Sequence, residues 1–464
     1  MDNLLNISPV DGRYHETTKE LSNYFSEYAL IKYRIFVEIK WLIYLLDKKI
    51  LDDKITNTEK EKLLNIYNNF NLSEAHKVKD IESTIKHDVK AIEYYLRDKF
   101  KELKLARLNP FIHIMLTSED VNNVSYNLMI KDTLNNIYYP KLEEFLNILD
   151  NLSNEYKETP MLSHTHGQVA TPTTVGKEIK VFSYRIKSIL EFLKNIKLKS
   201  KFSGAVGNYN CHIVAFPNIN WIEITKEFIE SLELEYNPLT TQIESHDILC
   251  LLLSNIKIIN NIIKDYNSDS WLYISMGYYK EKVNNKEVGS SVMPHKVNPI
   301  NHENSMANIE IANSIIDALV NNLSISRMQR DLSDSSKLRN LGVIFSHTLI
   351  SINQSIIGSN KITVNKELLD EELNNNYIVL SEAIQTVLRK EKKDNAYELL
   401  KELSRGHTVN KEIITKFIKD LPIKEEDKET LLKLEPSNYI GLASAIVEKN
   451  KWCNNYIILL YKIF

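Results

Sequence analysis

The stretch from residue 289 to residue 299, GSSVMPHKVNP, combines residue types that can do chemistry with a pattern that would position them. Its glycine and its two serines, Ser290 and Ser291, indicate a polar loop able to close over a site. Lys296 and Asn298 stand just before a proline suited to the first position of a helix. The free backbone N–H groups of a helix start, together with a lysine, can hold a carboxylate. The plainer interpretation is a linker followed by a helix cap.

Three other segments carry side chains suited to proton transfer or to hydrogen bonding. Residues 86–88, Lys-His-Asp, lie in a helical element predicted for residues 81–100, and His87 taken alone is better explained as a surface or core histidine. Residues 117–120, Thr-Ser-Glu-Asp, indicate a helix start, because hydroxyls that can cap a helix precede acids. Residues 163–168, SHTHGQ, indicate a polar, glycine-containing loop ahead of another helix.

Long helices are expected to position these segments. From Val175 to Ile196 apolar residues recur alternately four and three apart, as in a helix that lies nearly parallel to its partners in a bundle. Residues 248–278 are apolar on more than one side, so other helices should surround them. Strand signals are sparse, and the 11 glycines and 11 prolines are few for this length. The sequence therefore predicts an all-α protein with an elongated central bundle.

The helical pattern changes twice along the chain, which predicts three helical domains. Residues 1–110 begin with a turn-rich segment and then become helical. Residues 111–360 hold the long helices and the loop at 289–299. Residues 361–464 hold shorter helices with charged faces and indicate a small C-terminal domain.

The overall composition disfavours several classes of protein. The 464 residues include 58 basic and 61 acidic ones, interspersed, so no basic field suggests nucleic acid. Three scattered cysteines, Cys211, Cys250 and Cys453, suit neither a disulfide framework nor a zinc site, and we expect buried free thiols. The N-terminus lacks the regions of a signal peptide, and no apolar run is long enough to cross a bilayer. A cytoplasmic protein without membrane contact is expected.

The stretch at 289–299 resembles the signature loop of the fumarase/aspartase superfamily, G-S-S-x-M-P-x-K-x-N-P, and meets every fixed position. Further segments together resemble the adenylosuccinate lyase family, most closely a bacterial-type branch, over nearly the whole chain. These segments are Asp11-Gly12-Arg13-Tyr14, Lys86-His87-Asp88-Val89-Lys90, Thr117-Ser118-Glu119-Asp120, Thr165-His166-Gly167-Gln168, Thr240-Thr241-Gln242-Ile243-Glu244 and Gln329-Arg330-Asp331-Leu332-Ser333-Asp334-Ser335.

This resemblance implies three helical domains and a homotetramer around a bundle formed by the middle domains. It implies active sites where segments of three subunits converge. The implied enzyme is a C–N lyase that eliminates fumarate from adenylosuccinate to give AMP. The same family releases fumarate from succinyl-aminoimidazole-carboxamide ribotide (SAICAR) to give the carboxamide ribotide (AICAR). Neither a metal nor a cofactor is implied.

The resemblance also implies a role for each matched residue. Ser290 matches the catalytic base and His166 the general acid, which suits a group that titrates near neutral pH. In an alternative for the base, Ser290 only binds the substrate. In an alternative for the acid, His87 donates the proton and His166 has a structural or substrate-orienting role. Since the substrate carries two carboxylates and a phosphate, arginines are the natural counter-charges. The implied substrate-binding residues are Arg13, Tyr14, Lys86, His87, Asp88, Thr117, Ser118, Gln242, Ser291, Lys296, Asn298, Asn304, Arg330, Ser335 and Arg339.

Three positions depart from the branch that the sequence resembles. Val169 replaces a proline, Lys86 an asparagine and His164 an arginine, and Lys86 could contact a phosphate instead. None of these changes removes a proposed catalytic group. The alternatives are another lyase of the superfamily (argininosuccinate lyase, fumarase or aspartase) or a non-catalytic structural relative. The segments around Arg13 and Arg330 favour a nucleotide substrate.

Overall fold

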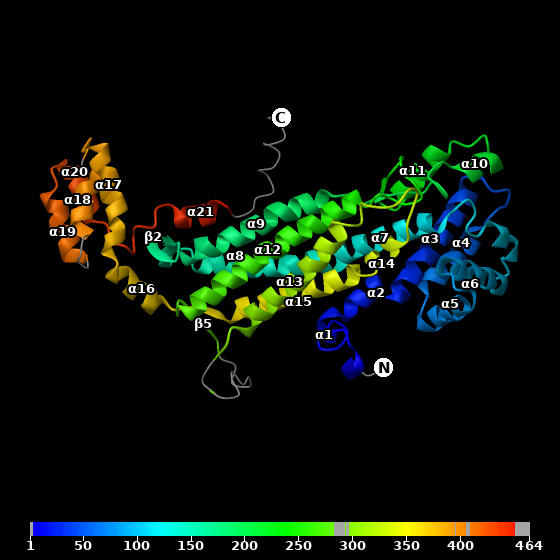
Figure 1. The fold of residues 1–464 in the computed structure, drawn as a ribbon, viewed down its shortest axis with the longest axis horizontal. Coiled ribbons are helices and arrows are strands. Elements are labelled where there is room, and N and C mark those ends of the chain that lie inside the picture. The colour runs from blue at the N-terminus through cyan, green and yellow to red at the C-terminus, as the bar shows by residue number, and fades with distance from the viewer. Residues whose placement is uncertain (1–2, 283–292, 294–296, 395, 405–408, 451–464) are drawn as a thin grey trace. The chain divides into compact units, whose positions relative to one another are not determined.

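Helices build almost the whole of the structure, a computed structural model (Figure 1). It describes residues 3–282, 293, 297–394, 396–404 and 409–450. Within these residues the strands form only two-stranded pairs, so the all-α prediction is confirmed. The chain divides into unit 1, which is Met1–Glu143, Ile189–Asn261 and Ala307–Asn353, and unit 2, which is Glu144–Ser188, Ile262–Met306 and Gln354–Phe464. The division into three domains by sequence position stays a prediction.

Unit 1 holds the first helices of the chain. Its elements are η1 (Asn3–Leu5), α1 (His15–Thr18), η2 (Lys19–Leu21), α2 (Ser22–Phe25), α3 (Glu27–Asp47), α4 (Asn57–Asn68), α5 (Leu72–Ile85), α6 (Asp88–Glu102), η3 (Ala106–Phe111), α7 (Ser118–Thr133), η4 (Leu134–Tyr138), β3 (Lys199–Ser200), α10 (Asn210–Ala215), α11 (Trp221–Ser231), β4 (Glu235–Tyr236) and α14 (Ser333–Leu338). Helices α3 to α6 pack on one another as a group (Figure 1).

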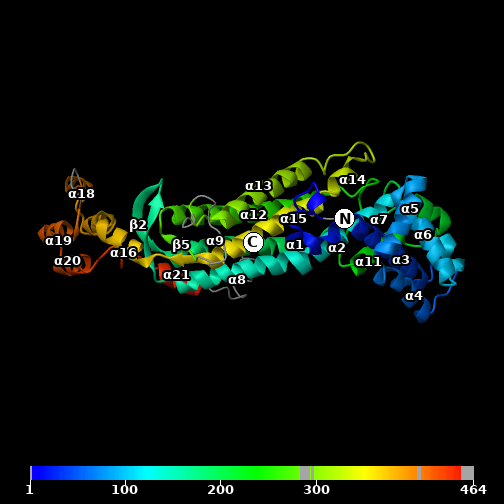
Figure 2. The same cartoon turned by 90° about the horizontal axis from the view of Figure 1, so that it is seen from below.

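Unit 2 holds the β-hairpin and the shorter C-terminal helices (Figure 2). Its elements are β1 (Pro160–Thr165), β2 (Gln168–Thr174), β5 (Tyr279–Glu281), β6 (Ile362–Val364), α16 (Lys366–Asn375), η5 (Tyr377–Leu380), α17 (Ser381–Lys390), α18 (Ala396–Ser404), α19 (Lys411–Asp420), α20 (Glu425–Leu432) and α21 (Ala443–Lys449). Five helices contribute residues to both units: α8 (Tyr139–Glu155), α9 (Val175–Asn195), α12 (Asp247–Ser275), α13 (Ile300–Val320) and α15 (Leu341–Lys361).

Several predicted helix boundaries are confirmed by the caps that create them. Thr117 caps α7 in a capping box with Asp120, whose side chain accepts the Thr117 backbone N–H at 2.8 Å. The helix expected from Val175 begins at that residue, and α13 begins at Ile300, directly after the proline of the loop segment. These boundaries are local, because each cap needs only residues within four positions of itself.

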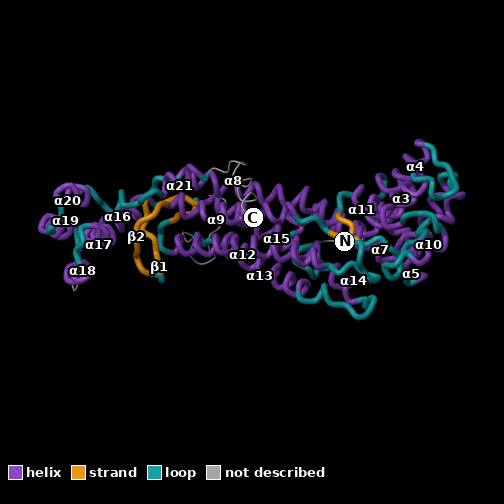
Figure 3. Tube along the Cα trace, turned by 90° about the horizontal axis from the view of Figure 1, so that it is seen from above, coloured by secondary structure: helices purple, strands orange, loops and turns teal. Residues whose placement is uncertain are grey.

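Three expectations are corrected. The element expected over residues 81–100 is two helices, because Lys86 adopts a left-handed φ of 56° that closes α5 and His87 then caps α6. Residues 163–168 lie in a β-hairpin, drawn in orange in Figure 3, where a plain loop was expected. Cys211 is exposed, although Cys250 is buried as expected; Cys453 lies outside the described residues.

In unit 1 an aromatic cluster ties α3 to the segment that follows β3. The ring of Trp41 on α3 meets Phe202 edge-on with 4.9 Å between ring centroids, and Phe228 of α11 at 5.0 Å. Next to Phe202, Lys201 is fully buried, and its ammonium group donates to Asp120 at 2.6 Å and to the Gly204 carbonyl at 2.6 Å. This ion pair joins the start of α7 to the chain after β3.

In unit 2 the long helices pack around Tyr266 of α12. Its ring lies 5.7 Å from that of Phe145 and 5.6 Å from that of Phe182, on α8 and α9. Its hydroxyl is 2.8 Å from that of Ser359 on α15. Helices α17 to α20 share a separate cluster of buried apolar residues, which explains why these short helices are stable.

One helical segment of the described chain, Ser333–Lys361, is long and apolar enough to cross a membrane. However, 72% of its most apolar window is buried inside the protein. A core helix has this burial, and Ile344, Ile350 and Ile352 are examples of the residues it places in the interior.

We predict that Lys201→Met strongly destabilises the protein. The substitution would leave Asp120 as a buried charge without its cation, which typically costs about 3–5 kcal/mol. Asp120 would keep only amide donors, from Thr117, Ser203 and Gly204. Urea unfolding measures the loss, and Lys19→Met, which breaks an exposed pair with Glu16, should change little. Equal effects of the two variants would contradict this role of the buried pair.

Candidate active site

The loop segment is only partly described. Ser290, Ser291 and Lys296 lie outside the described residues, and the expectations for them stay predictions. Asn298 is half-buried two residues before α13, and Asn304 is half-buried in the second turn of that helix. The helix start predicted behind the loop is therefore present: the Ile300 backbone N–H donates to the Asn298 carbonyl at 2.7 Å, and those of His302 and Glu303 donate to the Pro299 carbonyl at 3.1 and 3.2 Å.

His166 stands at the tip of the hairpin formed by β1 and β2. Thr165 pairs with Gln168, so the connecting loop has two residues, His166 and Gly167, with φ of 54° and 72°. Two positive φ values define the type I′ turn that suits the twist of a hairpin. The His166 side chain is exposed and makes no hydrogen bond with any described residue. The turn thus presents the imidazole of His166 to solvent at the end of a two-stranded hairpin.

In unit 1, the segment 86–88 is built around a helix start. His87 caps α6, because its Nδ1 accepts the Lys90 backbone N–H at 3.2 Å, while most of its ring is exposed. This hydrogen bond leaves Nε2 as the protonated and accessible nitrogen of a neutral ring. Lys86 is exposed, with its φ in the left-handed region.

Asp88 links this helix start to two arginines. Its Oδ2 lies 2.8 Å from Arg34 Nη2 and 3.7 Å from Arg339 Nη2, and Arg339 also binds Glu27. Burial alone would raise the pKa of Asp88. The charge of Arg34, the hydrogen bond from the Val89 amide and the charge of Arg339 outweigh it and hold that pKa below its ordinary value. Asp88 is therefore a carboxylate held between two guanidinium groups.

The other predicted arginine, Arg330, lies among buried polar groups. Its Nη2 is 3.2 Å from Glu119 Oε2 and 3.8 Å from Asp334 Oδ1. Its Nη1 lies 3.5 Å from the side-chain oxygen of Gln242, whose amide group donates to the Ala205 carbonyl at 3.0 Å. The structure thus brings together Gln242 and Arg330, two of the residues predicted from the sequence.

Glu119, His246 and Asp334 form a cluster of potential metal ligands, with ligand atoms within 4.8 Å of one another. The guanidinium group of Arg330 contacts both carboxylates and supplies a positive charge there. Burial raises the pKa of Glu119 to about 7 against the opposing charge of Arg330. Burial alone would lower the pKa of His246, but Asp334, Glu244 and Glu119 raise it above its ordinary value.

The remaining predicted residues lie on the surface of unit 1 or are half-buried there. Arg13 is exposed in the turn before α1, and Tyr14 directly precedes that helix. Thr117 and Ser118 are half-buried at the start of α7. The Ser335 backbone N–H donates to Asp334 at 2.7 Å, which ties this serine to the cluster around Arg330.

The sequence did not assign Arg34 or Asn122 to the site, although they stand between Arg339 and Arg330. Arg34 Nε donates to Asn122 Oδ1 at 2.8 Å, and Asn122 Nδ2 donates to Glu119 Oε2 at 3.4 Å. One signal was available: Arg34 is a charged residue on the buried stripe of α3, with Leu30 and Trp41 at helical spacing, and Glu38 is a second charged residue on that stripe. A buried charge on such a stripe needs a partner.

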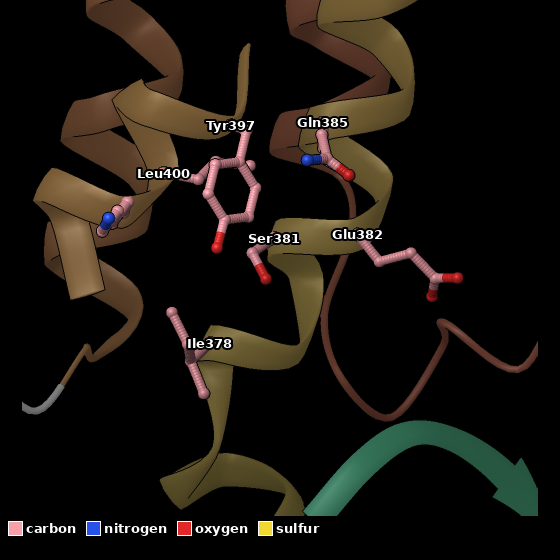
Figure 4. A pocket seen from close by; sticks show the side chains of 7 residues that line it. Ile378, Ser381, Glu382, Gln385, Tyr397 and Leu400 are labelled. Atoms are coloured by element: carbon pink, nitrogen blue, oxygen red, sulfur yellow. The ribbon is translucent and has the colours of Figure 1, made fainter.

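A cavity of about 380 Å³ lies elsewhere, in the C-terminal part of unit 2 (Figure 4). Its lining residues come from η5, α17 and α18 and include Ser381, Tyr397 and Glu382. The Glu382 carboxylate already accepts hydrogen bonds from the hydroxyls of Thr171 and Tyr439, at 2.7 and 3.0 Å. None of the predicted site residues lines this cavity.

Comparisons with known proteins identify the class first. The family model described as "Lyase" matches residues 12–312. Two solved structures share the fold, a fumarate lyase from Mesorhizobium sp. BNC1 (TM-score 0.72, 18% identity, 93% of this chain and 97% of that one) and a 3-carboxy-cis,cis-muconate lactonizing enzyme from Pseudomonas putida (TM-score 0.71, 18% identity, 93% and 96%). The fold is that of the fumarase/aspartase superfamily.

The particular family follows from closer relatives. A second family model, "Adenylosuccinate lyase C-terminal", matches residues 326–440. This chain also aligns with curated adenylosuccinate lyases. They come from Buchnera aphidicola (47% identity over 97% of this chain and 100% of the relative), Legionella pneumophila (47%, over 95% and 98%) and Escherichia coli (41%, over 97% and 100%). The chain belongs to the adenylosuccinate lyase family, within that superfamily.

The raised pKa of Glu119 predicts a pH dependence of stability. In the unfolded chain this carboxyl group titrates near 4.5, and in the folded protein near 7. The folded state therefore binds the proton more tightly, and the stability that this contributes is present below pH 4.5 and lost as the pH rises through 7. Relative to Glu119→Gln, which imitates the protonated form, wild-type protein should lose up to about 3 kcal/mol between pH 5 and pH 8.

Melting temperatures of both proteins at pH 5 and pH 8 measure this difference. The exposed Glu20, changed to Gln, serves as a control and should follow wild type at both pH values. A constant difference between wild type and Glu119→Gln across this range would show that Glu119 ionises in the folded protein as it does in the unfolded chain.

Proposed function

We propose that the protein is a C–N lyase that eliminates fumarate from adenylosuccinate to give AMP, and from SAICAR to give AICAR. The observation that carries this proposal is 41–47% identity to curated adenylosuccinate lyases over at least 95% of the chain. Argininosuccinate lyase, fumarase, aspartase and a non-catalytic relative have less support. The structural neighbours at 18% identity share the fold, and a shared fold does not specify the substrate.

The reaction needs a base, an acid and a means of holding a carbanion beside a carboxylate. Ser290 is the proposed base, and Lys296 with helix N–H groups would stabilise its alkoxide and the developing charge. His166 is the proposed acid that protonates the departing nitrogen. Its exposed position at the hairpin tip supports this role, since a general acid must reach the leaving group.

The anionic groups of the substrate need a second set of residues. Asn298, Thr117, Ser118 and Gln242 are proposed to bind the succinyl carboxylates with Lys296. Arg330, Arg339, Arg13 and Ser335 are proposed to bind the phosphate, with Tyr14 and the segment 86–88 beside the nucleotide. The half-buried hydroxyls at the start of α7 and the contact between Gln242 and Arg330 support this grouping.

We also propose a cytoplasmic homotetramer whose active sites combine segments of different subunits. Apolar side chains that one chain leaves exposed support it: Val181 and Tyr184 on α9, Leu251 and Ile258 on α12, and Ile311 on α13. Such faces are covered at low cost when like subunits pack in a closed symmetry.

The activity test is the ultraviolet spectral change as adenylosuccinate loses its succinyl group, repeated with SAICAR and with argininosuccinate. Adenylosuccinate and SAICAR should be consumed, while argininosuccinate should not. Ser290→Ala should lower turnover at least about 10²- to 10⁴-fold, the contribution of one acid–base group, while AMP still binds. Near-normal turnover in this variant would exclude Ser290 as the base. If the wild-type protein consumed argininosuccinate alone, the proposed substrate would be wrong.

The shared site predicts recovery of activity in mixed tetramers. Ser290→Ala and His166→Ala proteins, each inactive, are unfolded together at equal ratio and reassembled. If the two residues of one site come from different chains, about one site in four regains both wild-type groups. Activity should follow the product of the two fractions. Verified mixed tetramers that stay inactive at every ratio would place both residues on the same chain and leave the chemistry unaffected.

A further inference from the structure

We propose that Arg34 is a positioning residue for nucleotide binding, whose buried guanidinium group holds Asp88 and Asn122 and thereby fixes Arg339 and Arg330 relative to each other. Arg34 lies on α3 and is 1% exposed, so it can touch no ligand directly. It acts through its neighbours. The inference rests on the proposed function, in which Arg330 and Arg339 bind the substrate's phosphate.

The first branch of this network leads to Arg339. Arg34 Nη2 is 2.8 Å from Asp88 Oδ2, and the same carboxylate oxygen is 3.7 Å from Arg339 Nη2. Asp88 is the first residue of α6, so its backbone is already held by the helix start that His87 caps. Arg34 adds the constraint on its side chain. Without that constraint the carboxylate could turn, and Arg339 would keep only its half-buried partner Glu27.

The second branch leads to Arg330. Arg34 Nε donates to the side-chain oxygen of Asn122 at 2.8 Å, which fixes the orientation of the amide group. The NH₂ group of Asn122 must then face Glu119, where it donates at 3.4 Å to the oxygen that lies 3.2 Å from Arg330. Asn122 and Glu119 are 8% and 2% exposed, so solvent does not compete for these contacts.

The energetics favour a functional reason for this arrangement. Burying a guanidinium group costs free energy, and a well-packed apolar side chain in its place is often at least as stabilising. Moreover, Arg34 Nη1 is buried and has no hydrogen-bond partner among the described residues. An unpaired donor of a buried charge costs further stability. What Arg34 provides is a rigid planar group whose Nε and Nη2 hold two acceptors in a fixed relative geometry, which the flexible ammonium group of lysine does not impose.

The test compares Arg34→Met and Arg34→Lys with a matched control on the same helix. Glu38, one turn further along α3, is 3% exposed, pairs with His113 Nδ1 at 2.5 Å and also leaves one oxygen unpaired. Glu38→Gln therefore disturbs a similar buried pair outside the network. Measured for each protein are the melting temperature, kcat and KM with adenylosuccinate, and the dissociation constants of AMP and of fumarate.

Arg34→Met should weaken AMP binding and raise KM about tenfold or more, the loss of aligned charge-assisted hydrogen bonds, while kcat changes little. Fumarate binding should stay at the wild-type value, since fumarate has no phosphate. The AMP dissociation constant and the KM of Arg34→Lys should lie between those of wild type and Arg34→Met. Glu38→Gln should lower the melting temperature about as much as Arg34→Met does and leave the dissociation constant of AMP unchanged.

Two outcomes would overturn the inference. One is a dissociation constant of AMP that is the same in Arg34→Lys and Arg34→Met as in wild type. The other is an equal loss for AMP, fumarate and kcat, which a general structural role would produce. Should Arg34→Met fail to fold, Asn122→Ala tests the second branch alone, and wild-type AMP affinity in that variant counts against it. Wild-type protein that neither binds AMP nor consumes adenylosuccinate would instead refute the proposed function.

Discussion

The burial of charge at the start of α7 is the constraint on which unit 1 depends. Glu119 and Asp120 are adjacent, both buried, and each needs a cation. Asp120 obtains Lys201 from the segment after β3, and Glu119 obtains Arg330 from the segment before α14. Two segments that are far from α7 in the sequence are thereby held at its start, beside the hydroxyls of Thr117 and Ser118. Since an ionised carboxylate without its cation is costly in the interior, release of either segment alone would destabilise unit 1.

The same ion pairs explain why the proposed substrate-binding residues are stable without substrate. Arg330 and Arg339 each have carboxylate partners in the protein itself, Glu119 and Asp334 for one and Glu27 and Asp88 for the other. The partners neutralise both guanidinium groups, and the exposed surface of Arg339 and the partly exposed Arg330 remain available to a ligand.

Sequence reasoning predicted the features that are set by nearby residues. The cap at Thr117, the start of α9 at Val175 and the start of α13 all depend on residues within one helical turn, and the sequence displays those residues directly. The hairpin around His166 and the break between α5 and α6 were missed. Both depend on left-handed φ values at His166 and Lys86, residues whose types do not announce such a conformation as glycine would. The pairing of Glu119 with Arg330, and of Arg34 with Asp88 and Asn122, could not be predicted, because residues far apart in the sequence are paired by tertiary packing.

The turn at His166 has a consequence for how the sequence can change over evolutionary time. The position of its imidazole is set by two backbone dihedral angles and by the pairing of Thr165 with Gln168, and its neighbours Thr165, Gly167, Gln168 and Val169 are exposed. Exposed positions of a hairpin accept many side chains, provided that the register is kept. Drift such as the valine at position 169 can therefore accumulate beside a candidate catalytic group without displacing it. A chemical group held by the backbone is robust to genetic change in a way that one held by side-chain packing is not.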